Sequence, residues 1–369
     1  MKATFYTRVP YVGQAERRAW PASPVDCRAE IGQASMDLAL EAFEAADQLG
    51  FDWVTVAEHH YAPICLTPNP LVMAAALSQR VKRARIAVLG ADLPILNPVR
   101  VAEEFAMLDN LTGGRIVAGL LRGIPTEYLT YGVNVDESRE RFEEALTLMI
   151  HAWTEPQPFG WAGRYYDYRT VAVWPRPLQA PHPPIYMSGS SPDAAALAAR
   201  MRVGVGFAAT TLTSARECAC QYRSHAAAAG WHPTSEQVLY RISIHIGKTD
   251  AEAYATLDPE AFIVGQPTAS VSQALRQSSY RASSSATRTP TRTPAPTPAP
   301  RGAASVEARV ESGQLLIGSP DSVLRQIERV HRALQPGILD LNFPDLDRDA
   351  MLPALELFGR RVLPALQAM

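Results

Sequence analysis

Short apolar runs alternate along this chain with longer segments in which apolar residues recur at helical spacing. The run over 51–56 (FDWVTV) is rich in β-branched and aromatic residues and has no continuous polar face, as is typical of a strand buried in a parallel sheet. Similar runs predict strands over 3–9, 51–58, 84–89, 115–120, 185–188, 203–208, 238–246 and 337–343.

The segments between these runs predict helices. The periodicity over 34–49 stops at Gly50, a residue type that ends helices in the left-handed conformation. Pro98 suits the first turn of a later helix, because a backbone N–H is not needed there. The predicted helices cover 34–49, 71–81, 98–111, 138–153, 192–201, 214–229, 322–334 and 350–366.

The segment 156–184 interrupts the alternation, because it is rich in proline and aromatic residues. We interpret it as a hairpin-like insertion. The remaining pairs number about eight, so we predict one α/β domain over 1–369, a (β/α)8 TIM barrel. The alternative is an open doubly wound sheet. That fold typically has a glycine-rich, phosphate-binding turn after the first strand, and residues 8–13 (RVPYVG) do not form such a motif.

A tract at about 267–305 differs in composition from the rest of the chain, since Ser, Thr, Pro, Ala and Arg dominate it. No acidic residue occurs between Glu260 and Glu307. Such a composition cannot bury enough apolar area to offset its ordering entropy. We therefore predict a disordered or mobile insertion late in the barrel.

Composition narrows the function classes. The 35 basic and 37 acidic residues give a net charge of −2, which indicates neither a nucleic-acid partner nor an anionic membrane surface. The four cysteines are scattered, so we expect reduced thiols and no metal site. The N-terminal residues do not resemble a signal peptide, and no apolar run has the length of a bilayer span. We expect a cytoplasmic protein.

Polar residues that follow two of the predicted strands are the first candidates for chemistry. Glu58, His59 and His60 close the second strand, and Arg122 follows the fourth. The carboxyl ends of barrel strands are where barrel enzymes place their active sites, and histidine exchanges protons near neutral pH. A histidine pair at a strand end is equally often a hydrogen-bonded support for neighbouring loops, and a single arginine is more often an ion-pair partner.

A candidate anion site follows the fifth strand. Ser191 is a natural N-cap before Pro192, so the amides and dipole of the next helix invite an anion, and an arginine nearby can fork onto a phosphate. The chain repeats this helix start at Ser319, and barrels often bind phosphate late in the chain. The residues alone leave both helix starts open.

Taken together, the chain resembles the bacterial luciferase family of flavin-dependent monooxygenases, in particular the luciferase α subunit. The resemblance extends through most of the chain and is densest over 51–123. The linked motifs are AEHH (57–60), LTPNP (66–70), LP (93–94), NPVRVAEE (97–104), LDNL (108–111), GR (114–115) and GLLRG (119–123).

The resemblance implies a TIM barrel that binds reduced FMN and, in typical members, reacts it with O2 to give a flavin peroxide. His59 matches the histidine implicated in catalysis, with His60 as its neighbour in the substrate pocket. The resemblance places the FMN phosphate at Arg122, Ser190 and Ser191, not at Ser319, and a cis peptide against the flavin ring at Leu89-Gly90. The cofactor-binding residues that it implies are Tyr6, Leu89, Gly90, Arg122, Arg139, Gly189, Ser190 and Ser191.

Two features depart from the family. Leu121 replaces the reactive cysteine of luciferase, and the tract at 267–305 does not resemble the mobile active-site loop found there. Thiol chemistry is therefore not expected, and light emission is not implied.

The function implied is a reduced-FMN-dependent monooxygenase acting on a hydrophobic small molecule. The reaction would be aldehyde or ketone oxidation, Baeyer-Villiger oxidation, hydroxylation or epoxidation. The sequence has no nicotinamide fingerprint, so a separate flavin reductase would supply reduced FMN. Relatives commonly form homodimers. The alternatives are a deazaflavin-dependent oxidoreductase of the same fold and a non-catalytic flavin-binding partner subunit.

Overall fold

Alternate residues of strand β1 (Lys2–Tyr6) point to opposite sides of the sheet, so the strand contributes to a core on each side. Phe5 points outward into an aromatic cluster in which its ring lies 5.4 Å from Phe43 and 5.4 Å from Phe343. Thr4 points inward, because its hydroxyl contacts Asp340 on a neighbouring strand and lies 3.3 Å from the Thr55 hydroxyl. The strand is thus covered on both faces, as its apolar pattern predicted.

The computed structural model describes residues 1–16, 20–258, 305–343 and 348–369. Within them, eight parallel strands pair in a closed ring, since β8 pairs with β9 and β11 returns to β1. The TIM-barrel prediction is confirmed. In ring order the strands are β1 (Lys2–Tyr6), β2 (Trp53–Val56), β3 (Arg85–Asp92), β4 (Ile116–Leu121), β7 (Ile185–Ser188), β8 (Gly204–Phe207), β9 (Val238–Ile246) and β11 (Ile338–Asn342).

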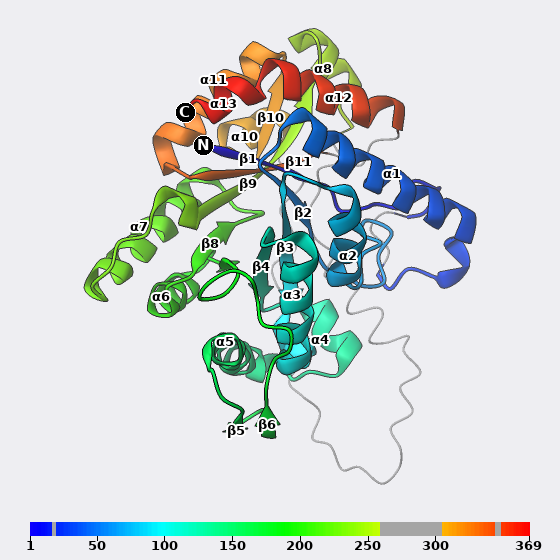
Figure 1. Ribbon diagram of the computed structural model, residues 1–369. Coiled ribbons are helices and arrows are strands. Elements are labelled where there is room, and N and C mark those ends of the chain that lie inside the picture. The colour runs from blue at the N-terminus through cyan, green and yellow to red at the C-terminus, as the bar shows by residue number, and fades with distance from the viewer. Residues whose placement is uncertain (17–19, 259–304, 344–347) are drawn as a thin grey trace.

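Helices cover the outside of the barrel (Figure 1). Their positions follow the predicted segments closely, with α6 at its predicted bounds. The helices of this layer are α1 (Ala29–Leu49), α2 (Pro70–Arg80), α3 (Pro98–Thr112), α5 (Ser138–Thr154), α6 (Pro192–Met201), α7 (Leu212–Ala228), α11 (Pro320–Leu334), α12 (Arg348–Arg361) and α13 (Leu363–Gln367).

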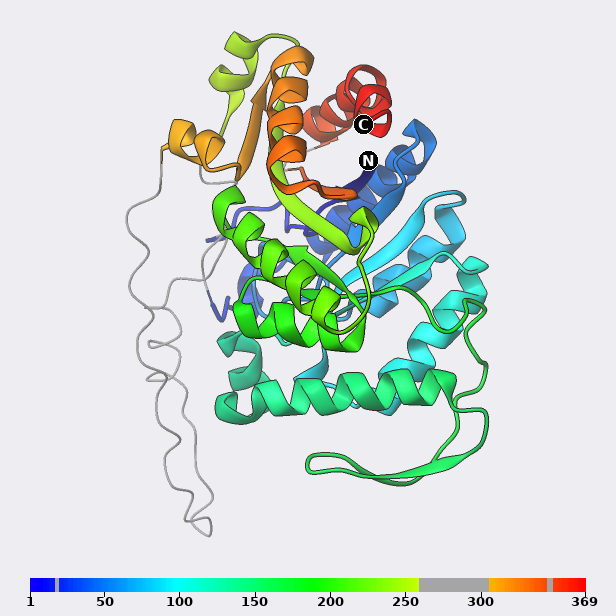
Figure 2. The same cartoon turned by 90° about the vertical axis from the view of Figure 1, so that its left-hand side faces the viewer.

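The predicted hairpin insertion is present. Strands β5 (Phe159–Ala162) and β6 (Asp167–Val171) pair antiparallel beside α5, at one end of the molecule (Figure 2). Glu144 of α5 anchors the hairpin, because its carboxylate accepts hydrogen bonds from the backbone N–H groups of Tyr165 at 3.0 Å and Tyr166 at 3.1 Å. The hairpin is therefore attached to the outer helical layer and lies apart from the barrel sheet.

Several short elements were not predicted. Among the described residues, a ninth parallel strand, β10 (Leu315–Gly318), pairs with the second half of β9 and with no other strand. The short elements are α4 (Pro125–Tyr131), α8 (Asp250–Thr256), α10 (Val306–Glu311), β10 (Leu315–Gly318) and the 3-10 turns η1 (Pro24–Asp26), η2 (Leu93–Ile95), η3 (Val135–Glu137) and η4 (Ser235–Gln237). Most of the tract at 267–305 lies outside the described residues.

An apolar layer fills the barrel interior near the amino ends of the strands. Trp53 and Tyr186 meet there edge to face at 5.6 Å, and Leu239 lies beside Ile338 on the neighbouring strand. Since this layer closes one end, polar side chains further along the strands are reached only from the carboxyl end.

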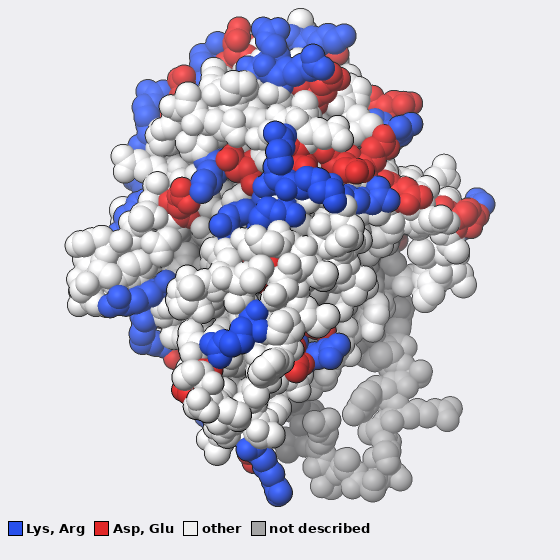
Figure 3. All heavy atoms as spheres, viewed as in Figure 1, with Lys and Arg blue, Asp and Glu red and all other residues white. Residues whose placement is uncertain are grey.

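The surface matches the balanced charge. On the face shown in Figure 3, basic and acidic side chains are interleaved in a band and leave large uncharged areas elsewhere. No helix among the described residues has the length and apolar character needed to cross a bilayer.

Candidate active site at the carboxyl end of the barrel

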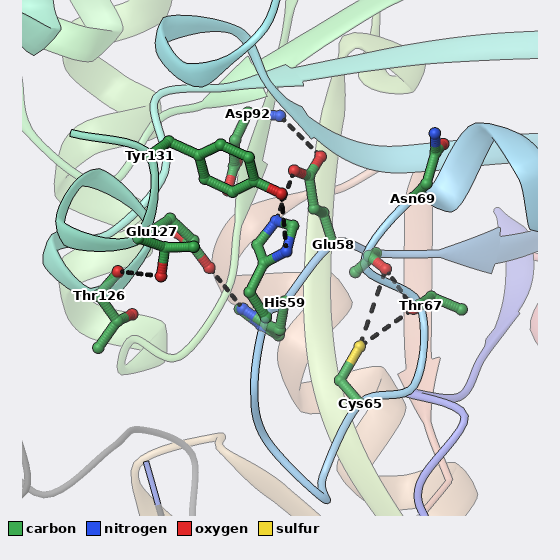
Figure 4. Close-up of polar contacts among 12 residues, drawn as sticks. Glu58, His59, Cys65, Thr67, Asn69, Asp92, Thr126, Glu127 and Tyr131 are labelled. Atoms are coloured by element: carbon green, nitrogen blue, oxygen red, sulfur yellow. Dashed lines mark hydrogen bonds and ion pairs between the residues drawn. The ribbon is translucent and has the colours of Figure 1, made fainter. Parts of the chain in front are cut away.

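The segment after β2 places two histidines at the barrel mouth. The Thr67 hydroxyl donates to the Ala57 carbonyl at 2.6 Å and lies 3.0 Å from the Cys65 sulfur, which ties the following loop to the strand end. The two histidines then contact different carboxylates: His59 points toward Glu127 (Figure 4), and His60 lies beside Glu58.

His60 is enclosed by protein. Its Nε2 lies 3.0 Å from Oε1 of Glu58, its Nδ1 lies 3.3 Å from the Tyr131 hydroxyl, and its carbonyl accepts from the Trp20 indole N–H at 3.0 Å. Both ring nitrogens thus have partners. The arrangement holds the loop together, and a role for His60 in a substrate pocket stays a prediction.

His59 is held at one end and open at the other. Its Nδ1 lies 3.0 Å from Oε1 of Glu127, and its side chain is 34% exposed whereas that of Glu127 is only 2% exposed. A carboxylate accepts hydrogen bonds and does not donate, so the Nδ1 proton points to Glu127 and Nε2 is left for a ligand. This is the arrangement of a positioned acid or base.

A buried acid, Asp92, completes the group. It ends β3, and its backbone N–H donates to Oε2 of Glu58 at 3.1 Å (Figure 4). Burial raises the pKa of the Asp92 carboxyl well above its usual range, and the nearby carboxylates of Glu127 and Glu58 raise it further. These surroundings therefore favour the protonated form of Asp92, which could donate to the neighbouring Glu127 carboxylate.

The sequence did not reveal Glu127. Its second oxygen accepts from the backbone N–H of Ile124 at 2.6 Å, at the start of α4. Pro125 in the first helical turn and an acid at the third position form a recognisable helix start. That signal was present in the chain, but it predicts a helix cap and not a partner for a histidine far away in sequence.

Two buried glycines, Gly90 and Gly119, allow β3 and β4 to pack closely against each other. The Leu89–Gly90 peptide bond is cis, as the family resemblance implied, and the β3–β4 register shifts between Leu89 and Ala91. A Cβ added at Gly90 would lie 2.3 Å from Cγ of Leu121, and one added at Gly119 would lie 2.3 Å from the carbonyl oxygen of Val88. Atoms of the neighbouring strand therefore fill the space beside both glycines.

The predicted phosphate residues gather on adjacent strands. Arg122 follows β4, Ser190 and Ser191 follow β7, and these strands are hydrogen-bonded neighbours. Ser191 caps α6 by accepting from the Ala194 N–H at 3.3 Å. Arg122 and Ser190 are exposed, so donors are available for an anion.

Two further predicted residues support this helix start. Arg139 lies at it, because its Nη1 is 2.7 Å from Oδ2 of Asp193 in the first turn of α6. Gly189 permits the turn, since an added Cβ would lie 2.9 Å from the Phe207 ring.

The alternative anion site, the helix start at Ser319, is already occupied by the side chain of Asp250. The carboxylate of Asp250 accepts from the Ser319 backbone N–H at 2.6 Å and from the Ser322 hydroxyl at 2.9 Å. These hydrogen bonds lower the pKa of Asp250, the Ser319 backbone bond most. A protein carboxylate therefore occupies the anion position of α11, which favours the start of α6 as the open site.

Tyr6 lies inside the barrel rather than at its rim. Its ring is buried under the Arg241 guanidinium, whose Cζ is 3.6 Å from the ring centroid. Burial raises the pKa of the Tyr6 hydroxyl to about 12. The structure thus places Tyr6 with β9 and β11, away from the glycine-rich wall of β3 and β4.

A family profile described as luciferase-like monooxygenase matches residues 14–335. The chain is 26% identical over 333 residues to 4-hydroxyprotoasukamycin monooxygenase of Streptomyces nodosus subsp. asukaensis, covering 88% of this chain and 85% of that protein. It is 34% identical over 157 residues to an uncharacterized protein of Sinorhizobium fredii. There the match spans 46% of the relative, so the aligned part is under half of that protein's length.

Solved structures agree with the fold. The monooxygenase RslO1 from Streptomyces bottropensis superposes with a TM-score of 0.75 at 26% identity, covering 99% of both chains. The oxygenating constituent of 3,6-diketocamphane monooxygenase from Pseudomonas putida, in complex with FMN, gives a TM-score of 0.71 at 20% identity, covering 98% of this chain and 97% of that one. An F420-dependent secondary alcohol dehydrogenase gives 0.67 at 18%, covering 90% and 95%.

Proposed function

The chain belongs to the luciferase-like monooxygenase family, and we propose that it is the oxygenase component of a two-component system that uses reduced FMN and O2 to oxidise a hydrophobic small molecule. The observation that carries the proposal is His59, which Glu127 holds by Nδ1 at the barrel mouth with Nε2 open. Fold alone would not select this chemistry, since the barrel hosts many reactions.

The residues at the mouth fit FMN in two parts. The cis peptide at Leu89 and Gly90 would lie against the ring. Arg122, Ser190 and Ser191 would hold the phosphate, with Arg139 and Gly189 shaping that end. Reduced FMN supplies the electrons with which O2 is activated. His59 would move a proton at Nε2, while Asp92 and Glu127 keep its ring in one orientation.

The partners follow from this chemistry. A flavin reductase would deliver reduced FMN, and the Pseudomonas protein is itself called an oxygenating constituent, which fits such a division of labour. We further propose a homodimer formed through α2 and α3, where Val72, Met107 and Leu111 are exposed apolar residues.

A deazaflavin oxidoreductase is the second candidate, because an F420-dependent dehydrogenase shares the fold. It would transfer hydride without O2. Titrating reduced FMN and reduced F420 in parallel separates the two.

The test is an oxygen-dependent assay with reduced FMN against aldehydes, ketones and polycyclic aromatics, with products read by mass spectrometry. We expect His59→Ala to keep FMN binding and to lose product formation by about a hundredfold or more. His225→Ala, an exposed histidine on α7, is the matched control and should behave like the wild type. Unchanged turnover in His59→Ala would reject the role of His59. Turnover only with F420 would reject the oxygenase.

A further inference from the structure

The barrel interior holds an ion pair that the proposed chemistry does not use. Nε of Arg241 lies 2.5 Å from Oδ2 of Asp340, and the two residues are register partners on β9 and β11. The Asp340 side chain is fully buried, and its other oxygen accepts from the Thr4 hydroxyl. Burying such a pair costs desolvation energy that apolar residues of similar volume would avoid, so its presence inside a barrel calls for a reason.

The guanidinium faces the barrel mouth. Leu239 and Ile338 lie two residues earlier on the same strands and belong to the apolar layer that closes the other end. The 17% of the Arg241 side chain that is exposed therefore opens toward the carboxyl end, where His59 and Asp92 also lie. Among the described residues, Asp340 pairs with Arg241 through Nε, so the N–H groups on the two terminal nitrogens remain for a ligand.

The donors are also fixed in direction. The Tyr6 ring lies 3.6 Å from the guanidinium carbon, and Asp340 holds one edge, so the plane of the group has little freedom. A preorganised donor loses little entropy when it binds an acceptor. Because the charges of Arg241 and Asp340 cancel, this pair suits a neutral oxygen acceptor better than a full anion.

We propose that Arg241 donates a hydrogen bond to a carbonyl oxygen of the substrate and so selects aldehydes and ketones over hydrocarbons of the same skeleton. This inference rests on the proposed function, since it names the substrate class of that same site. Tyr6 and Asp340 act by positioning the guanidinium. The wall formed by β1, β9 and β11 is then the substrate side of the barrel, opposite the glycine-rich wall of β3 and β4.

The experiment measures binding of matched probes to the full chain by calorimetry, with and without oxidised FMN. Two skeletons carry three end groups each: acetophenone, ethylbenzene and benzoate, and octan-2-one, octane and octanoate. We expect at least one ketone to bind about tenfold or more tightly than its hydrocarbon, as a hydrogen bond from a charged donor provides. The infrared carbonyl stretch of 13C-labelled ketone should also shift to lower frequency on binding.

The informative variant is the double substitution Arg241→Gln with Asp340→Asn, because it removes both charges together and leaves no unpaired buried carboxylate. It should abolish the ketone preference and the infrared shift. Arg241→Lys, which keeps the charge and loses the fork, should weaken both. Ser243→Ala is the control. Its hydroxyl contacts Asn342 and not Arg241, so the ketone preference should persist.

Three results would overturn the proposal. The wild type could bind ketone and hydrocarbon equally, or bind neither. The ketone preference could survive in the double variant, or the wild type could bind the carboxylate more tightly than the ketone in an Arg241-dependent way. Failure of the proposed function looks different. If the chain shows the Arg241-dependent ketone preference but no turnover with reduced FMN and O2, the carbonyl site is supported and the oxygenase proposal is rejected.

Discussion

At the scale of single residues, Asp92 is the acid of this site whose ionisation its surroundings disfavour most. Its pKa is raised by burial first, then by Glu127 and Glu58. An acid with a raised folded-state pKa gives stability that is fully present below its unfolded pKa of about 3.9 and is lost as pH rises through the folded-state pKa. We therefore expect Asp92→Asn, which stays neutral and can still donate to Glu127, to melt at a higher temperature than the wild type at pH 8.

The melting-temperature difference should narrow as the pH falls toward about 4 and should close about one unit lower, where Asp92 is protonated in both the folded and the unfolded chain. Its free-energy equivalent is about 1.4 kcal/mol for each unit by which the pKa is raised. Asp167→Asn, an exposed carboxyl in the hairpin, is the control and should show no such gain. Thermal melts from about pH 3 to pH 8 give the answer, and parallel curves for Asp92→Asn and the wild type would contradict a raised pKa at Asp92.

The sequence could identify His59 but not what holds it. Glu58, His59 and His60 are adjacent in the chain, and the strand before them is strongly apolar, so local pattern sufficed. Glu127 meets His59 across 68 positions, through a short helix that has no apolar periodicity of its own. Arg241 and Asp340 were missed because an inward-facing charge on a buried strand cannot be told from an outward one before the ring closes.

At the scale of elements, the barrel depends on close contact between β3 and β4 at Gly119. A Cβ there would lie 2.3 Å from the carbonyl oxygen of Val88, so strand backbone would have to move. We expect Gly119→Ala to lower the free energy of unfolding by about 1–3 kcal/mol, as overpacking does. Gly206→Ala on β8 is the matched control, since its Cβ would come no closer than 3.7 Å to a neighbour. Urea unfolding compares them, and equal effects would argue against the tight contact.

All eight ring strands were predictable because each is a buried parallel strand rich in apolar residues, even though β9 and β11 also carry polar residues such as Arg241 and Asp340. Strand β10 was missed. It is only Leu315–Gly318 and pairs with a stretch of β9 that extends beyond the ring, which no local pattern indicates. The single helix expected over 350–366 is divided into α12 and α13, because Pro364 cannot supply a backbone N–H to continue the first helix.

At the scale of the whole molecule, the barrel mouth has two unlike halves. The β3, β4 and β7 side carries the cis Leu89–Gly90 peptide and the open start of α6, whereas the β1, β9 and β11 side carries the Arg241–Asp340 pair, with the guanidinium over the Tyr6 ring. His59 and Glu127 reach the mouth from the ends of β2 and β4. A flat phosphorylated cofactor on the first side and a carbonyl compound on the second would bring their reacting parts together near His59.

This division predicts how the whole chain responds to flavins. A ligand that binds only the folded chain stabilises it, by about 2.7 kcal/mol at 100 times its Kd. FMN should therefore raise the melting temperature more than riboflavin, which lacks the phosphate, and Arg122→Met should remove that difference while leaving the riboflavin effect. Arg169→Met, an exposed arginine in the hairpin, should keep it. Equal stabilisation of the wild type by FMN and riboflavin would mean that the phosphate is not bound between β4 and α6. Loss of both effects in Arg122→Met would instead mean that Arg122 supports the ring site.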